Sequence, residues 1–282
     1  MASCPGPFDA AGENLKEDAK QTYNRYDAVV NREPASTRHL DRLGFEMSRT
    51  QTSACPSWLY KSAVTPSDAR RRLGIEWSAR VVAVAICGWN FQTGSFRQSD
   101  RSLSEYLPFA EPVSRFAARE GLAVVVFSHA NGFARSNNGI VPQPGTDAVH
   151  ADRLADCLRR LGTKEVTLVR GPVKAEVAHS FLGSCNYVVS GRLHGAVAAL
   201  SAGIPTVCLD YGLGPENLKT RGFMEMVGCE DFFVPPEADP ISSALARATK
   251  EGLREKICDQ VADVRNSAHN TWQIFDSIVD IK

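Results

Sequence analysis

The sequence lacks several features that would place it in a common class of protein. Lys plus Arg and Asp plus Glu each number 32 in the 282 residues, so the formal net charge is zero. A neutral chain has no overall field to hold nucleic acid or an anionic membrane, and any anion binding must be local. No apolar run approaches the roughly 20 residues that span a bilayer. The N-terminal residues show neither the basic start nor the apolar stretch of a signal peptide.

The cysteines form no metal or redox motif. No two of the eight make a CxxC pair, and no group of Cys and His residues has the spacing of zinc ligands. Cys87, Cys185 and Cys208 lie in or beside apolar runs, where a free cysteine behaves as a small hydrophobic residue. Free cysteines are typical of a reducing compartment. We therefore expect a cytoplasmic protein with no metal, no integral membrane segment and no nucleic-acid partner.

Short apolar runs alternate with helical patterns from about residue 66 onward. The runs of strand length are 81–86, 122–128, 165–169, 187–190 and 206–210, and the helical patterns lie near 101–120, 147–161, 173–183, 194–202 and 216–227. Continuous apolar strands that alternate with helices indicate a parallel sheet covered on both faces. The sequence therefore predicts an α/β fold with a Rossmann-like parallel sheet and helices on both of its faces. Segment 129–147 lacks this pattern, and we expect it to be a loop at the ligand-binding edge of the sheet.

The two ends of the chain differ from this regular part. Residues 1–62 show a polar helix near 12–25, a short strand at 27–31, a helix at about 34–43, which ends at Gly44, and a second short extended piece at 52–60. Because two short strands bury little by themselves, we expect this part to be the end of an N-terminal α/β half with a linker.

The remaining residues divide into two parts. Residues 63–256 form the expected Rossmann-like, donor-binding domain. Residues 257–282 carry apolar side chains on one face at helical spacing. They predict an amphipathic helix that packs on the core or across to the N-terminal half.

The strongest candidate site lies in a strand–helix–strand segment, VVSGRLHGAVAALSAGIPTVCLDYG, at residues 188–212. Arg192 and His194 stand at the start of its helix, just after a strand. The amides of a helix N-terminus carry the positive end of the helix dipole and attract anions. An arginine adds a fork that matches phosphate or carboxylate, and a histidine can exchange a proton near neutral pH. The segment thus indicates an anion site with a proton-transfer group.

The small residues of this helix fit such a site. Gly195 and the alanines that follow it let the helix lie close to the sheet, and Gly203 and Pro205 end the helix. The residue types also allow a structural interpretation, in which Arg192 pairs with a carboxylate and the histidine stabilises the fold. Both interpretations stay open at this point.

The same segment resembles the R-L-H-x-x-x-x-A-x-x-x-G-x-P signature of the polysaccharide pyruvyl transferase family. Two looser matches lie upstream. YDAVVNREPASTRHLDRLGF, at residues 26–45, resembles the family's strand followed by Arg-Asp/Glu, two residues, Ser and a helix ending in Leu-Gly. The residues Gly6-Pro7-Phe8 resemble the Gly-Pro turn before it. The resemblance covers the chain from residue 6 to about residue 228.

The resemblance implies a transferase that moves an enolpyruvyl unit from phosphoenolpyruvate to a sugar and forms a pyruvate ketal on two hydroxyls. It implies a two-domain fold like that of GT-B glycosyltransferases, with no cofactor apart from the donor substrate. The implied partners are phosphoenolpyruvate and a glycan or lipid-linked sugar acceptor, as in exopolysaccharide biosynthesis. Family members carry a further N-terminal Rossmann-like half. Since this chain begins near the end of that half, we expect much of the acceptor-side domain to be missing.

The resemblance also implies roles for particular residues. Arg192 and the Leu193 amide hold the phosphate or carboxylate of the donor, and His194 protonates the methylene carbon or helps the phosphate to leave. Further donor contacts are expected from Gly195, Tyr211 and Lys219. For the last two residues, a tight turn and a solvated helix surface are the structural alternatives.

One position departs from the family pattern. Many members have a donor-binding arginine just after the strand that begins the C-terminal half, where this chain has Cys87. The sequence leaves open whether Arg97, Arg135 or Arg170 replaces that arginine.

Five further residues are candidates for substrate contact: Arg32, Trp89, Asn90, His129 and Asn131. For Arg32, pairing with Glu33 or with a neighbouring helix is the favoured interpretation. Trp89 follows a strand and could stack on a sugar. His129 and Asn131 follow another strand at the same sheet edge, where ordinary loop roles are equally expected. Asp147 is expected to cap a helix rather than to act as a base.

Two other functions compete with pyruvyl transfer. GT-B nucleotide-sugar glycosyltransferases share part of the signature, but they carry a ribose-binding glutamate where this chain has Ala198. The other rival is a non-catalytic, truncated family member that acts as a binding module, which the missing half and Cys87 favour.

Overall fold

The computed structural model describes residues 13–76, 79–91, 101–136, 139–210 and 218–279. These residues form two compact units, each built from separate stretches of the chain. One unit contains residues 61–214 and 231–258, and we call it the sheet unit. The other contains residues 1–60, 215–230 and 259–282, and we call it the terminal unit.

The sheet unit is built on one parallel sheet with the strand order β10-β9-β8-β3-β4-β7. Its strands are β3 (Val81–Ala85), β4 (Ala123–Phe127), β7 (Val166–Val169), β8 (Tyr187–Ser190), β9 (Thr206–Leu209) and β10 (Phe233–Val234). The buried, β-branched composition of β3 and β4 suits strands that are covered on both faces. The predicted Rossmann-like sheet is therefore confirmed.

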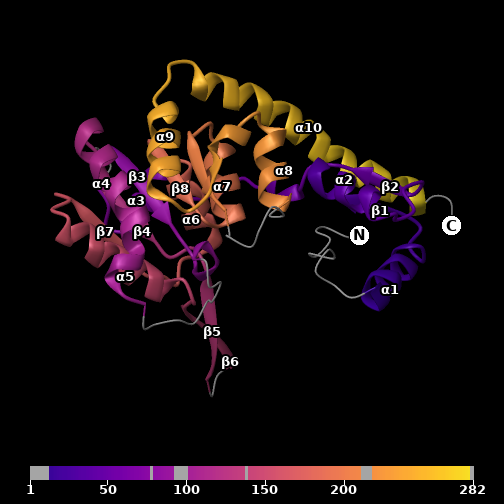
Figure 1. The fold of residues 1–282 in the computed structure, drawn as a ribbon, viewed down its shortest axis with the longest axis horizontal. Coiled ribbons are helices and arrows are strands. Elements are labelled where there is room, and N and C mark those ends of the chain that lie inside the picture. Colours follow the sequence, from indigo (N-terminus) through magenta and orange to yellow (C-terminus); the bar gives the residue numbers. More distant parts are fainter. Residues whose placement is uncertain (1–12, 77–78, 92–100, 137–138, 211–217, 280–282) are drawn as a thin grey trace. The chain divides into compact units, whose positions relative to one another are not determined.

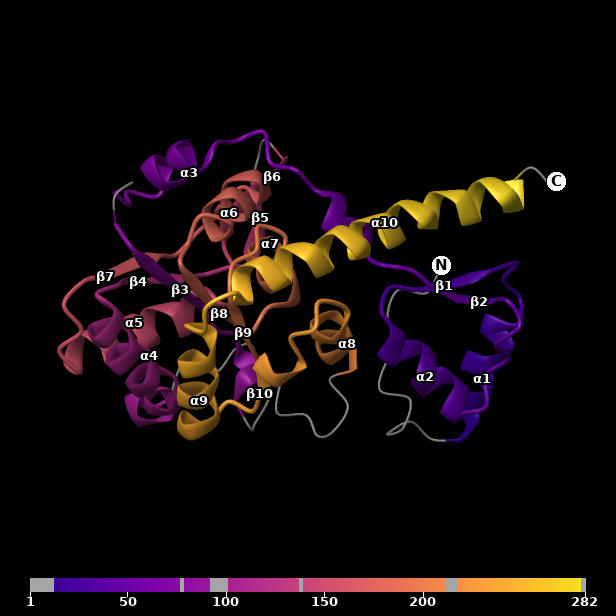
Figure 2. The ribbon, with the colours of Figure 1, turned by 90° about the horizontal axis from the view of Figure 1, so that it is seen from above.

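Helices cover both faces of this sheet, as the sequence predicts. Figure 2 shows α3 (Pro66–Arg72), α6 (Ala175–Leu182) and α7 (Leu193–Leu200) on one side of the sheet. The other side carries α4 (Leu107–Glu120), α5 (Ala148–Arg160) and α9 (Ala238–Ala248). The sequence patterns predict α5, α6 and α7 to within a few residues, whereas α4 begins six residues later than its pattern, after a 3-10 turn at Leu103–Tyr106. The patterns miss α3, α9 and β10.

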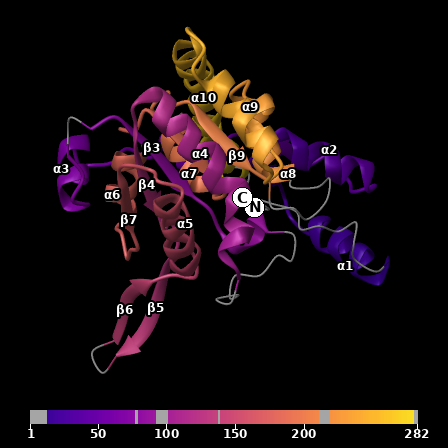
Figure 3. The same cartoon turned by 60° about the vertical axis from the view of Figure 1, so that its left-hand side comes forward.

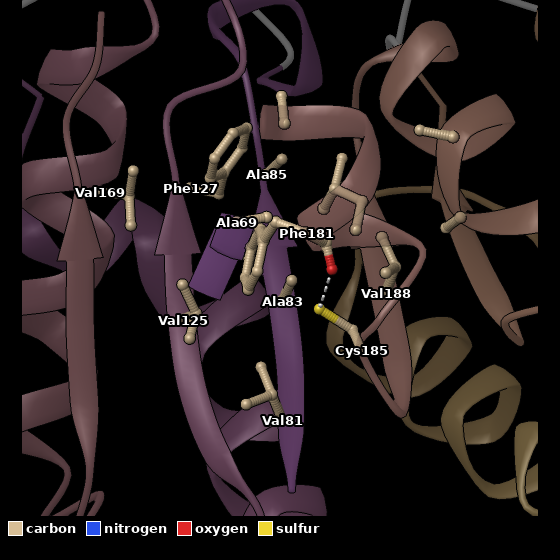
Figure 4. Close-up of a cluster of buried hydrophobic side chains, with 14 of the residues drawn as sticks. Ala69, Val81, Ala83, Ala85, Val125, Phe127, Val169, Phe181, Cys185 and Val188 are labelled. Atoms are coloured by element: carbon tan, nitrogen blue, oxygen red, sulfur yellow. Dashed lines mark hydrogen bonds between the residues drawn. The ribbon is translucent and has the colours of Figure 1, made fainter. Parts of the chain in front are cut away.

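The core beneath α6 and α7 is closely packed. Phe127 of β4 and Phe181 of α6 lie near each other above the sheet, with ring centroids 5.6 Å apart (Figure 4). Ala198 and Ala199 of α7 belong to the same cluster. Their small side chains let the backbone of α7 approach the strands, which brings the start of that helix to the edge of the sheet.

The order of the strands creates a switch point between β3 and β8. The chain first builds outward from β3 through β4 to β7, and then returns to place β8 on the other side of β3. Val82 pairs with Tyr187 across this junction. In open parallel sheets, ligands bind beyond the carboxyl ends of the strands at such a point.

Segment 129–147 corrects the prediction of an irregular loop. Asn131–Ser136 (β5) and Gly139–Pro144 (β6) form an antiparallel ribbon that extends away from the sheet (Figures 1 and 3). The apolar Phe133 and Ile140 are 68% and 71% exposed. Because neither strand has a buried face, the sequence shows no alternation of apolar and polar residues that would predict a strand here. Prolines occur in β6 because a two-stranded ribbon leaves one edge of each strand without a hydrogen-bonding neighbour.

The terminal unit contains shorter elements. They are α1 (Glu13–Tyr23), β1 (Val29–Asn31), α2 (Pro34–Arg42), β2 (Thr50–Thr52) and α8 (Leu218–Met226), together with most of α10 (Leu253–Val279). Strands β1 and β2 pair in parallel. Ser53 donates a hydrogen bond to the Ser267 carbonyl of α10 at 2.5 Å. The predicted helices α1, α2 and α8 are confirmed, Gly44 has the positive φ of a helix-ending glycine (75°), and α10 begins four residues earlier than the sequence pattern suggests.

Candidate functional site

A cluster of polar side chains lies at the carboxyl edge of the sheet, beside the switch point. It is formed by the residues that follow β3, β4 and β8, together with the first residues of α5 and α7. The sequence candidates that the fold brings to this edge are Asn90, His129, Arg192, Leu193, His194 and Gly195.

Arg192 is held by a buried carboxylate. Its Nε donates to Asp147 Oδ2 at 2.9 Å, and its Nη2 donates to Asp147 Oδ1 at 2.5 Å. The Asp147 side chain is 0% exposed, whereas 21% of the Arg192 side chain remains exposed. Two parallel hydrogen bonds fix both the position and the plane of the guanidinium. The alternative in which Arg192 pairs with a carboxylate therefore describes the structure.

Asp147 has a different role from the one expected. It occupies the N-cap position of α5, but its side chain makes no capping hydrogen bond. Its Oδ2 instead accepts a hydrogen bond from the amide of Ala130 at 3.2 Å. Because the partner of its carboxylate lies 45 residues away in sequence, the local capping pattern gave the wrong role for this side chain. Asp147 joins the end of β4 to the start of α7.

His129 lies half-buried against the first turn of α7. A Cβ atom at Gly195 would stand 3.2 Å from His129 Cδ2 and 2.9 Å from Ser190 Oγ, so a side chain there would force the ring and the serine hydroxyl to shift. Burial lowers the pKa of His129 to about 4, and the positive charges of Arg192 and His194 act in the same direction. The Asp147 carboxylate opposes this shift. The imidazole is therefore neutral at physiological pH.

The first turn of α7 has no side-chain cap. Arg192 is its N-cap residue and has extended backbone angles, but its side chain does not bond to the helix amides. Leu193 is buried, while the His194 side chain is exposed. The positive end of the helix dipole and an exposed imidazole thus lie at the same place as the Arg192–Asp147 pair.

Asn90 connects the strand ends at the switch point. Its Oδ1 accepts from the amide of Cys87 at 2.8 Å, and its Nδ2 donates to the Asp210 carbonyl at 3.0 Å. Cys87 itself is 0% exposed, with its Sγ 3.5 Å from the Gly191 carbonyl oxygen. An arginine at position 87 would place a charge inside this packed junction. The departure from the family pattern is therefore accommodated by a small buried thiol.

Asn131 supports a loop beside the site. Its Nδ2 donates to the Val173 carbonyl at 2.6 Å, and its Oδ1 accepts from the Val173 amide at 2.9 Å. The carboxamide therefore acts on the chain that follows β7, at the same edge of the sheet. Among the arginines considered as replacements, Arg170 bonds to Asp152 at 2.7 Å and Arg135 lies exposed on β5. Arg97 and Tyr211 lie outside the described residues, as does the side chain of Trp89.

Arg32 and Lys219 belong to the terminal unit. The Arg32 guanidinium lies over the ring of Phe223 in α8, 5.7 Å from its centroid. Glu33 is fully buried and is the N-cap residue of α2. Its carboxylate accepts a hydrogen bond from the amide of Ser36 in the first turn of that helix. Burial raises the pKa of Glu33 to about 7. The Arg-Glu-x-x-Ser motif thus caps one helix and packs against another.

Two further properties concern the described ranges alone. No helix there combines the length and the apolar composition needed to cross a bilayer. No three His, Cys, Asp or Glu side chains in the same ranges are grouped so that they could hold a metal ion.

Several solved structures share this architecture. Anabaena HepE in complex with UDP superposes with a TM-score of 0.58 at 15% identity, over 99% of this chain and 70% of that one. Sucrose-phosphate synthase from Thermosynechococcus elongatus gives 0.56 at 16% identity, over 98% and 64%. A glycosyltransferase from Rickettsia africae gives 0.56 at 11% identity, over 99% and 69%. The chain therefore has the fold of GT-B glycosyltransferases.

A family profile assigns the chain to a smaller group of proteins than its fold does. Residues 11–212 match the profile of the polysaccharide pyruvyl transferase family, and the chain belongs to that family. The match includes the Arg192–Leu193–His194 segment at the switch point. No curated protein matches the sequence significantly. The chain spans 64% of the length of sucrose-phosphate synthase.

Proposed function

We propose that the protein is a glycan-modifying transferase that uses phosphoenolpyruvate to form a pyruvate ketal on a sugar. The sheet unit would bind the donor at the carboxyl edge of β3 and β8. The observation that carries the proposal is the position of the family signature, since Arg192, Leu193 and His194 begin the helix at the switch point of the sheet. Family membership supports the same conclusion.

The reaction needs two proton transfers and no oxidant. One sugar hydroxyl adds to C2 of phosphoenolpyruvate while C3 gains a proton, which turns the methylene group into a methyl group. A second hydroxyl then displaces phosphate from C2 and closes the ketal, and its proton leaves with the phosphate. The protein must therefore hold an anion, orient two hydroxyls and move protons at neutral pH.

The residues at the edge of the sheet supply these functions. Asp147 fixes the plane of the Arg192 fork, and the amides of the α7 first turn add the positive end of the helix dipole. His194 would protonate the methylene carbon or assist the departing phosphate. The Arg192 charge is balanced by Asp147, so the donor's negative charge requires a further cation.

Calorimetric titration of the full chain with phosphoenolpyruvate tests the proposal. We expect saturable binding that Arg192→Gln weakens at least tenfold, because the guanidinium charge and its N–H donors beyond those bonded to Asp147 are lost. Arg159→Gln is the matched control, since Arg159 pairs with Asp156 on the surface of α5 at 3.4 Å. This control should bind as the wild type does. A folded wild-type chain that binds no phosphoenolpyruvate at millimolar concentration contradicts the proposal.

A nucleotide-sugar transferase is the second candidate, because Anabaena HepE binds UDP on the same fold. Ala198 opposes it. This residue is 3% exposed and packs in the core against the sheet, so the position of the ribose-binding glutamate is filled by an apolar contact. Titration with UDP and UDP-glucose decides between the two, because the rival requires binding of the nucleotide and the proposed function does not.

A further inference from the structure

His129 differs from the other buried or half-buried histidines whose hydrogen bonds are defined. His150 Nδ1 bonds to the hydroxyl of Tyr106 at 3.0 Å, and His39 Nδ1 bonds to Arg42 Nη2 at 2.8 Å. Those rings are tied to neighbouring side chains. The contacts of the His129 ring include the ring of Phe127, 6.1 Å away between centroids, and the first turn of α7. The ring therefore lies between these two groups.

The fold leaves space for this ring at a particular point. Gly195 is the third residue of α7, and a side chain there would meet both the His129 ring and Ser190 Oγ. The ring therefore lies against the helix turn that is proposed to bind the donor. The charged and titratable groups that act on it come from three elements, namely Asp147 before α5, Arg192 before α7, and His194 within α7. The imidazole is thus part of the anion site.

We infer that His129 carries a proton from the attacking sugar hydroxyl to the methylene carbon of phosphoenolpyruvate. The inference rests on the proposed function. The O–H bond of the first hydroxyl breaks as its oxygen bonds to C2, and the proton passes to the imidazole. In the same step the C2=C3 π bond breaks, and its electron pair takes a proton from the imidazole to form the new C–H bond at C3, which becomes a methyl group. The proton of the second hydroxyl leaves with the phosphate, which is the role that remains for His194.

The electrostatics of the site suit a relay. In the free protein, the ring is neutral because burial lowers its pKa to about 4, so it can accept a proton. A bound phosphoenolpyruvate anion would stabilise the imidazolium form and raise that pKa. The protonated ring can then donate to C3. His194 is exposed and lacks this burial, so it is less suited to hold a proton away from water.

The test compares His129→Gln with the wild type in the full chain. The probes are phosphoenolpyruvate with methyl galactoside, methyl glucoside and methyl mannoside as acceptors, and phosphate release gives the rate. We expect kcat to fall by about 10²- to 10⁴-fold, the usual contribution of a proton-transfer group. The affinity for phosphoenolpyruvate, measured by calorimetry, should change less than about threefold because the relay acts after binding. His269→Gln, an exposed histidine on α10, is the matched control and should leave both values unchanged.

The pH profile and a second variant separate a relay from a structural role. Wild-type kcat/KM should stay level from pH 8 to about 5 and fall through a pKa of about 4, and the residual activity of His129→Gln should lack that fall. Gly195→Ala, which displaces the ring without removing it, should lower kcat in the same direction. Imidazole NMR signals of His129 should shift when phosphoenolpyruvate is added to the wild type.

The outcomes distinguish this inference from the proposed function. If the wild type releases phosphate and folded His129→Gln keeps its kcat within threefold, the inference is overturned while the proposed function stands. A wild-type chain that neither binds phosphoenolpyruvate nor turns over any probe overturns the proposed function, and this inference with it. Binding of phosphoenolpyruvate without any shift of the His129 signals also overturns the inference.

Discussion

The carboxamide of Asn90 occupies the space that a side chain at position 191 would need. A Cβ atom at Gly191 would stand 1.9 Å from Asn90 Oδ1. Asn90 cannot move away easily, because it bonds to the amide of Cys87 and to the carbonyl of Asp210. The glycine before Arg192 is therefore required for close packing at the switch point.

Gly191→Ala should lower the free energy of unfolding by roughly 1–3 kcal/mol, as overpacking of a close junction does. Chemical denaturation measures the change. In an Asn90→Ala background the obstructing carboxamide is absent, so the same substitution should cost clearly less. Equal costs in the two backgrounds would mean that the two residues are not coupled.

Asp147→Asn should remove the charge that orients Arg192. We expect a loss of about 3 kcal/mol of unfolding free energy, since the carboxylate is fully buried and its partner keeps a half-buried charge. Phosphoenolpyruvate binding should weaken as well, because the fork loses its fixed plane. Asp152→Asn breaks the more exposed pair with Arg170 and is the control, with an expected change below about 1 kcal/mol. A similar effect of both variants would show that burial of Asp147 is not important.

Glu33→Gln should change how stability depends on pH. The pKa of Glu33 is about 7 in the folded protein and about 4.5 in the unfolded chain. The folded state therefore favours the protonated form, and this contribution to stability is complete below about pH 4.5 and is lost as the pH rises through 7. Glutamine keeps the shape and a capping oxygen but has no charge.

Thermal unfolding at pH 5 and pH 8.5 tests this prediction. From pH 5 to pH 8.5 the wild type should lose on the order of 2 kcal/mol of unfolding free energy that Glu33→Gln keeps, so the variant becomes more stable relative to the wild type at the higher pH. Glu46→Gln is the control, because Glu46 is an exposed surface residue. A constant difference between wild type and Glu33→Gln across this range would contradict the raised pKa.

Asn131→Ala should loosen the chain that follows β7. Both hydrogen bonds to Val173 are lost, which at an exposed position costs roughly 1 kcal/mol. Amide hydrogen exchange of Val173 should become faster. Asn131→Asp keeps the acceptor for that amide, so exchange there should change less than in the alanine variant. Unchanged exchange in Asn131→Ala would show that the carboxamide does not hold this segment.

The sequence predicts the parts of the fold that depend on local pattern. The parallel sheet follows from apolar runs such as 81–86, and the end of α2 follows from Gly44. Elements with weak or short patterns escape such reasoning. β10 contains two residues, and the exposed ribbon of β5 and β6 has no buried face to mark it.

The site is only partly predictable for a related reason. The Arg192–His194 segment can be chosen as a candidate site from the sequence, because the start of a helix and the family signature coincide there. Its partner Asp147 resembles an ordinary N-cap, and only the folded chain shows that its carboxylate turns away from α5. The burial that keeps His129 neutral is likewise a property of packing. The two glycines that surround the site, Gly191 and Gly195, are the signal in the sequence that a close approach occurs there.

The interleaving of the two units limits how this protein can be recombined. The terminal unit is assembled from three stretches of chain, and the polypeptide passes between units after residues 60, 214, 230 and 258. A single genetic crossover therefore cannot exchange one unit for that of a relative. The two units would have to diversify by point substitution within one gene, or by multiple exchanges that coincide with those four positions.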